Sequence, residues 1–183
     1  MNASESDGNR RHEIVGPAQS EVAIELIARV FSQDEPLAVT VGQSRDEFTR
    51  MLGVFLPAAL PARQTMAALI DGKLVGIALT TAFTFTPPPE IEGTSPNYPP
   101  IGALIAALER DYEILKATAR NAASNGFDAL LTDATNPTSQ SVFAKLGFET
   151  LNEMAYESFA HDGAPRFASL AKLGSIKLME KRL

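Results

Sequence analysis

The stretch TDATNPTSQSVFAKLGFET, residues 132–150, decides the fold, because it contains a strand end, a polar turn, a short helix and a stop. The apolar run FDALLTDA (127–134) that leads into it is typical of a buried strand. Thr135 or Asn136 can cap a helix whose first position is Pro137. Gly147 then ends that helix. The sequence therefore predicts a strand–turn–helix unit with a polar elbow at residues 135–139.

Strands are predicted on both sides of this unit. Downstream, ETLNEMAYESFA (149–160) and GSIKLMEKRL (174–183) have alternating apolar positions and form a predicted C-terminal β pair. Upstream, two apolar runs in TMAALIDGKLVGIALTTAFTF (65–85) flank Asp71-Gly72, the dipeptide that a two-residue hairpin prefers. HEIVGPA (12–18) is a further candidate strand.

Three helices are predicted from apolar residues spaced three and four apart. The first covers residues 19–31 with Ser20 as its cap and ends near Gln33, because Pro36 disfavours helix before it. The second follows Ser44 and is closed by prolines 57 and 61. The third runs from residue 101 to 125, about 25 residues or roughly 37 Å. The proline-rich segment 87–100 is predicted as a surface loop.

Composition restricts the class of protein. Hydrophobic residues make up 45% of the 183 and charged residues 21%, which is typical of a soluble globular protein, and the net charge of −6 argues against a nucleic-acid partner. The order of the predicted strands and helices, with a βαβ unit and a final β pair, predicts an α/β domain with a mixed sheet. The chain has no cysteine, so it has neither disulfides nor thiolate metal sites. We expect a disordered lead-in at residues 1–11 and one domain at 12–183. The expected protein is cytoplasmic, without a membrane span, and a monomer or homodimer.

The order of these segments carries a family resemblance. DEPL at 34–37, the run from Thr135 to Phe148 that ends in Phe-x-Lys-Leu-Gly-Phe, and IKLM at 176–179 occur in the order found in one superfamily. The chain resembles the GCN5-related N-acetyltransferase (GNAT) superfamily, and within it the arylalkylamine (dopamine-type) branch. That resemblance implies a mixed, mostly antiparallel sheet flanked by helices, with a βα crossover and the C-terminal β pair.

The resemblance implies a general base at Glu35, the acid of the Glu-Pro-Leu segment. Acetylation of an amine requires the neutral amine, although alkyl amines are protonated at pH 7, and a nearby carboxylate can take the proton directly or through a water. The alternative from the residues alone is that Glu35 is a solvated loop acid before a helix-breaking proline.

The resemblance also assigns roles in the elbow. Ser139 and Thr135 match two catalytic hydroxyls four residues apart, and either could assist the departing thiolate of the cofactor. Asn136 and Ser139, with Phe143 and Lys145 farther along the helix, match the segment that binds acetyl-CoA. Many acetyltransferases carry a tyrosine general acid where this chain has Phe143. The alternative is that Thr135 or Asn136 merely caps the helix.

One family feature is missing. The loop Gln/Arg-x-x-Gly-x-Gly/Ala, which binds the CoA pyrophosphate, is expected just before Ile114, but no glycine occurs between Gly102 and Gly126. The preceding central strand is missing too. Three explanations stay open: the natural protein has a segment that this sequence lacks, the deletion is genuine, or another part such as 86–100 binds the phosphates.

The predicted function is therefore acetyl-CoA-dependent transfer of an acetyl group to a small primary amine, by direct attack in a ternary complex. The alternative is a non-catalytic, acetyltransferase-like binding module without the pyrophosphate loop. No spacing typical of a metal site occurs, and His12 and His161 lie far apart without partnering carboxylates in the sequence.

Overall fold

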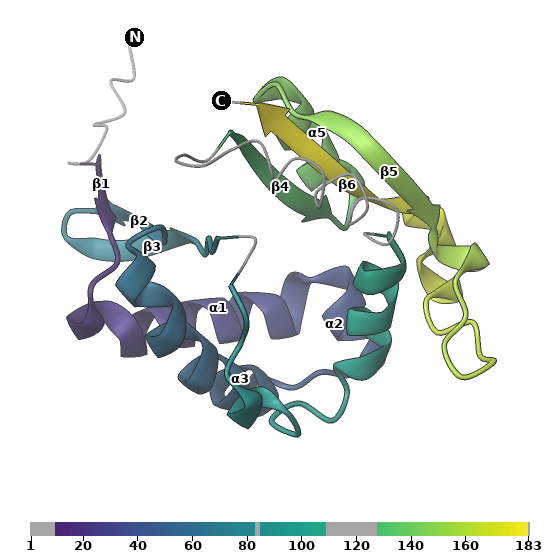
Figure 1. The fold of residues 1–183 in the computed structure, drawn as a ribbon, viewed down its shortest axis with the longest axis horizontal. Helices are drawn as coiled ribbons and strands as arrows, with labels where there is room; N and C mark the ends of the chain where they lie inside the picture. The colour runs from purple at the N-terminus through teal and green to yellow at the C-terminus, as the bar shows by residue number, and fades with distance from the viewer. Residues whose placement is uncertain (1–9, 83–84, 109–127, 183) are drawn as a thin grey trace, which may run out of the picture. The chain divides into compact units, whose positions relative to one another are not determined.

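The computed structural model describes residues 10–82, 85–108 and 128–182 (Figure 1). The chain forms two compact units, and each is described by itself below. The first unit comprises Met1–Asp34 and Gln43–Pro96, and the second comprises Glu35–Gly42 and Asn97–Leu183. Across the described ranges, none of the helices has the length and apolarity needed to cross a membrane.

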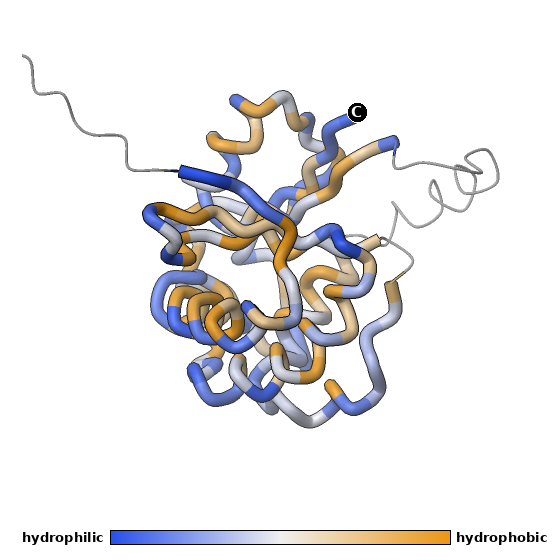
Figure 2. The backbone as a smooth tube through the Cα atoms, turned by 90° about the vertical axis from the view of Figure 1, so that its left-hand side faces the viewer, coloured by the Kyte–Doolittle hydropathy of each residue, from blue (hydrophilic) through white to orange (hydrophobic). Residues whose placement is uncertain are grey.

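The first unit combines two long helices with a three-stranded antiparallel sheet. The helices are α1 (Ser20–Asp34) and α3 (Arg45–Ala59), and the sheet has the order β1-β2-β3. Its strands are β1 (Arg10–Ile14), β2 (Met66–Ile70) and β3 (Lys73–Ala78), and single 3₁₀ turns are η1 (Pro17–Gln19), η2 (Leu60–Ala62) and η3 (Pro89–Ile91). β1 lies at an edge of the sheet, and its first residues are charged and exposed (blue in Figure 2), which protects an open edge from further pairing.

Short sequence motifs correctly predict the β2–β3 turn and the start of α3. The predicted hairpin turn is confirmed, since Asp71 and Gly72 both adopt positive φ, 50° and 77°, as a two-residue turn between twisted strands requires. Ser44 caps α3 by accepting a hydrogen bond from the Glu47 N–H. α3 passes through Pro57 before it ends, because a proline this close to the last turn removes only one helical hydrogen bond. The core of this unit consists of Val15, Ala23, Leu56, Leu60, Ala67 and Leu69.

The second unit is built on the sheet β4-β6-β5, with strands β4 (Ala129–Ala134), β5 (Glu149–Ala155) and β6 (Ser175–Arg182). β4 and β5 both pair antiparallel with β6, so they run parallel to each other on either side of it. The connection between them through α5 (Pro137–Lys145) is therefore a βα crossover. The C-terminal β pair is β5 with β6, as predicted.

Helices and two 3₁₀ turns complete the second unit. They are α2 (Pro36–Val41), a helix that includes residues 99–108, η4 (Tyr156–Ser158) and η5 (Ala168–Leu173). One buried cluster joins them to the sheet, namely Leu37, Ile101, Leu104, Leu108, Tyr156, Phe159, Phe167, Ile176 and Leu178. Because Leu37 belongs to it, burial of apolar surface holds α2, and with it Glu35, on the same core as β6.

The α/β class with antiparallel strands and flanking helices is confirmed, with two differences in detail. The described strands are divided between two sheets rather than joined in one. α2 was not predicted. Pro36 disfavours helix at the residue before it, but proline is favoured at the first position of a helix, and Pro36 is the first residue of α2. The predicted helix 101–125 beyond residue 108, and the place of the missing loop before Ile114, lie outside the described residues.

Candidate functional site

Glu35 is the N-cap of α2, not a solvated loop acid. Its backbone is extended, and its Oε2 accepts a hydrogen bond of 2.7 Å from the Ala38 N–H. Its other oxygen, Oε1, is buried and has no hydrogen-bond partner in the part of the chain that the structure describes. A buried carboxylate oxygen without a partner is costly in a folded protein and therefore calls for an explanation. Glu35 is thus anchored by one oxygen and has the other available.

The polar elbow forms a capping box. Asn136 is the N-cap of α5, and its Oδ1 accepts from the Ser139 N–H at 2.9 Å. Ser139 Oγ accepts from the Asn136 N–H at 3.3 Å and donates to the Asn136 carbonyl at 2.9 Å. Pro137 occupies the first helical position. The capping interpretation is therefore confirmed for Asn136 and not for Thr135, which lies one residue before the cap. A catalytic role for Ser139 would be additional to its place in the capping box, since a hydroxyl can rotate to a new acceptor.

Tyr156 is bonded to the elbow and senses the charge of Glu35. Its side chain is 0% exposed, and its hydroxyl donates to the Thr135 carbonyl at 2.5 Å. Burial, and after it the charge of nearby Glu35, raise the pKa of the Tyr156 hydroxyl well above its ordinary value. The hydroxyl therefore joins the turn after β5 to the end of β4, and Tyr156 also packs in the same buried cluster as Leu37 of α2.

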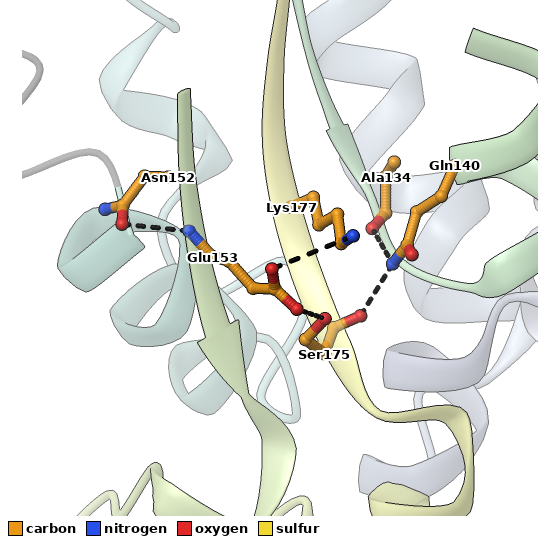
Figure 3. Close-up of polar contacts among 6 residues, drawn as sticks. All are labelled: Ala134, Gln140, Asn152, Glu153, Ser175 and Lys177. Atoms are coloured by element: carbon orange, nitrogen blue, oxygen red, sulfur yellow. Dashed lines mark hydrogen bonds and ion pairs between the residues drawn. The ribbon is translucent and has the colours of Figure 1, made fainter. Parts of the chain in front are cut away.

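The side chain of Gln140 also restrains the elbow, through hydrogen bonds from α5 to two strands. Gln140 of α5 donates through Nε2 to the Ala134 carbonyl at 3.3 Å and to the Ser175 carbonyl at 2.8 Å (Figure 3). These carbonyls lie at the last residue of β4 and the first of β6. The amide thereby joins the start of α5 to two strands, and the elbow has little freedom to move.

A neighbouring acid contrasts with Glu35. Glu153 of β5 accepts from Ser175 Oγ at 2.5 Å, and its other oxygen lies 3.7 Å from Lys177 Nζ (Figure 3). Asn152 accepts from the Glu153 N–H and donates to the Leu108 carbonyl. Both oxygens of Glu153 are thus engaged, so this cluster ties β5 to β6 and offers no available base.

Two residues predicted to bind the cofactor lie farther along α5. The Phe143 ring packs edge-on against Phe148, 5.1 Å between centroids, and Lys145 is exposed in the last turn. None of the contacts described for the chain links Phe143 or Lys145 to Glu35. Their assignment to the acetyl-CoA site stays a prediction. The segment expected to bind the phosphates of acetyl-CoA lies outside the described residues.

Sequence reasoning missed Tyr156 and Gln140. The partner of the Tyr156 hydroxyl is 21 residues away, and one partner of Gln140 is 35 residues away. Neither residue belongs to a local motif. The sequence predicts Tyr156 inside a strand over 149–160, whereas β5 ends at Ala155 and Tyr156 begins η4, and Gln140 is an ordinary member of the predicted helix. Only the folded β4-β6-β5 arrangement brings these donors to their carbonyls.

The raised pKa of Tyr156 predicts a loss of stability at high pH. The phenol keeps its proton in the folded chain above pH 10.0, its ordinary pKa, whereas the unfolded chain releases it. Its stabilising contribution is therefore fully present below about pH 10 and is lost as the pH rises, by at most about 1.4 kcal/mol per pH unit. Urea unfolding between about pH 8 and pH 11 should show a shallower decline for Tyr156→Phe than for the wild type. Equal slopes would contradict this assignment.

Solved structures of amine-modifying proteins resemble this chain. No protein-family model matches it. The C-terminal condensation domain of Ebony, solved with beta-alanyl-dopamine, superposes with a TM-score of 0.79 at 13% identity, covering 96% of this chain and 100% of that chain. Arylalkylamine N-acetyltransferase 2 from Aedes aegypti gives 0.69 at 21% identity, covering 95% and 99%. A Drosophila melanogaster polyamine N-acetyltransferase gives 0.68 at 14%, covering 96% and 100%.

These likenesses define the class of fold. The chain has the GNAT fold, as the sequence resemblance predicted. More narrowly, its structural neighbours include arylalkylamine N-acetyltransferases, the branch named by the sequence resemblance, and also a polyamine N-acetyltransferase.

Proposed function

We propose that the chain catalyses transfer of an acetyl group from acetyl-CoA to a small primary amine. The observation that carries this proposal is the buried Oε1 of Glu35, which lacks a partner among the described residues, on a helix whose Leu37 packs in the same cluster as Tyr156. A carboxylate that is fixed by one oxygen and available through the other is suited to accept a proton from an ammonium. The amine acylation named for several structural neighbours supports the same chemistry.

In the proposed reaction, Glu35 Oε1 takes one proton from the bound ammonium, directly or through a water. The neutral amine nitrogen then attacks the thioester carbonyl, and a C–N bond forms. The C–S bond breaks, the thiolate leaves, and the nitrogen gives up its second proton to the thiolate sulfur, so that the products are a neutral amide and a free thiol. Ser139 Oγ, which in the structure donates to the Asn136 carbonyl, can rotate to donate a hydrogen bond or proton to that thiolate, with Thr135 as the second hydroxyl. The anchored elbow provides the fixed geometry on which such catalysis depends.

Incubation with acetyl-CoA and a panel of arylalkylamines, diamines and polyamines tests the proposal. Amide products, identified by mass, should form together with stoichiometric CoA release. Glu35→Gln serves as the matched negative control, because it keeps the size and the capping oxygen of the side chain. No amide with any amine in the panel would count against the proposal.

A second candidate function uses a different acyl donor. Two observations favour it: the condensation domain of Ebony gives the TM-score of 0.79 noted above, and the segment 103–125 contains no glycine for a pyrophosphate loop. In this alternative, Glu35 again takes the proton from the amine, but the acyl donor is an aminoacyl thioester. The protein does not bind that donor through CoA phosphates.

Donor comparison separates the two candidates. The assays use acetyl-CoA, acetyl-pantetheine and an aminoacyl-pantetheine with one amine. Preference for acetyl-CoA over acetyl-pantetheine supports the first candidate, since only CoA carries the pyrophosphate. Equal use of both acetyl donors, with faster turnover of the aminoacyl donor, supports the second. Micromolar binding of acetyl-CoA by calorimetry without turnover of any donor would instead support the binding module.

A further inference from the structure

Tyr156 makes hydrogen bonds through both its backbone and its side chain. Its backbone N–H donates to the Gly174 carbonyl at 3.2 Å, just before β6. Its ring is fully buried and faces Phe167 with the centroids 6.4 Å apart. Because the ring is packed and the main chain is bonded, the position of the phenol oxygen is fixed. It donates to the Thr135 carbonyl.

The acceptor of this bond lies at a structural boundary. The β4–β6 ladder ends at Ala134, which pairs with Lys177, and α5 is capped by Asn136. Thr135 lies between them, one residue past the ladder. The Tyr156 hydroxyl therefore takes the place of a strand partner at the residue that links β4 to the capping box of Ser139. This bond is part-buried, and removing the hydroxyl would leave the Thr135 carbonyl without that donor.

The same hydroxyl lies close to Glu35, whose charge acts on it. Leu37, which follows Glu35 in α2, packs in the same buried cluster as the Tyr156 ring. The side chain that fixes the elbow is thus also part of the surroundings of the base.

We propose that Tyr156 is a positioning residue, whose hydroxyl bond to the Thr135 carbonyl holds the elbow bearing Ser139 in place relative to Glu35. The inference rests on the proposed function, since it names a residue for that same site. Tyr156 acts through Thr135 and needs no contact with either substrate.

The test compares two hydroxyl deletions in one turn. Tyr156→Phe keeps the packed ring and removes only the bond to the elbow. Ser158→Ala removes a similar hydroxyl-to-carbonyl bond, 2.8 Å to Ala155, at an exposed position of η4. We expect Tyr156→Phe to lower kcat about tenfold while donor affinity by calorimetry changes by less than about twofold. Ser158→Ala should match the wild type in both.

Hydrogen exchange provides a readout that does not depend on turnover. In Tyr156→Phe, peptides that contain the first turn of α5 should exchange faster, whereas those from β6 should not. A merely stabilising role would instead speed exchange throughout the second unit.

The proposal is overturned if Tyr156→Phe keeps kcat within about twofold of the wild type, or loses donor affinity in the same proportion as kcat. Unchanged exchange in the first turn of α5 also overturns it. A wild type that forms no amide contradicts the proposed function itself, whereas an active wild type with an equally active Tyr156→Phe contradicts only the positioning role.

Discussion

Glu35→Gln is expected to lower kcat/KM for an alkyl amine at pH 7 by about 100-fold or more. An alkyl ammonium resembles the lysine side chain, so fewer than about one molecule in 1,000 is neutral at that pH. The glutamine amide can still accept the Ala38 N–H bond that caps α2, so the fold should survive. It cannot accept a proton at the buried position of Oε1. The measurement is steady-state amide formation under saturating donor.

The control for this variant is Asp34→Asn. Asp34 precedes Glu35 and is exposed, so its change alters the local charge equally without touching the cap. We expect its activity to lie within about twofold of the wild type. Equal losses in the two variants would mean that general electrostatics, and not a base at Glu35, governs the rate. Retained activity in Glu35→Gln would remove Glu35 from the mechanism.

Leu104→Ala should reduce the free energy of unfolding by about 3–5 kcal/mol. Leu104 is 0% exposed and belongs to the cluster that also contains Leu37 and Tyr156. Alanine leaves a cavity that a packed interior fills only in part, and it favours the helical backbone, so the loss reports on packing alone. Since globular proteins are stable by only about 5–15 kcal/mol, the effect is large. Urea unfolding followed by circular dichroism measures it.

Leu146→Ala is the matched control, because it makes the same chemical change at a side chain that is 55% exposed. Its unfolding free energy should differ from the wild type by less than about 1 kcal/mol. A similar loss in both variants would show that residues 99–108 do not pack into the core of the second unit as described.

Sequence reasoning predicted the features of this fold that depend on neighbouring residues. The Asp71-Gly72 turn, the Ser44 cap and the Asn136 cap are set by backbone conformation and by hydrogen bonds over three residues. The crossover through α5 followed from the strand–turn–helix pattern around Pro137. Each of these signals lies within one element or its ends.

The features that the sequence could not predict depend on contacts over long separations. Glu35 Oε1 is buried by packing within the second unit. Neighbouring residues alone do not predict that burial, so they left a solvated acid as the alternative to a base. The bond from Tyr156 to Thr135 has no local signature. The reason that α2 was not predicted is different. Pro36 disfavours helix at the residue before it, and it also favours the start of a helix at its own position.

The central claim is that Glu35 removes the proton of the acceptor amine. The most direct test compares Glu35→Gln with the wild type on two acceptors at pH 7: an alkyl amine, which must lose a proton before attack, and an aromatic amine, which is already neutral. We predict a defect of about 100-fold or more for the alkyl amine and of less than about tenfold for the aromatic amine. Equal defects for both acceptors would contradict the claim.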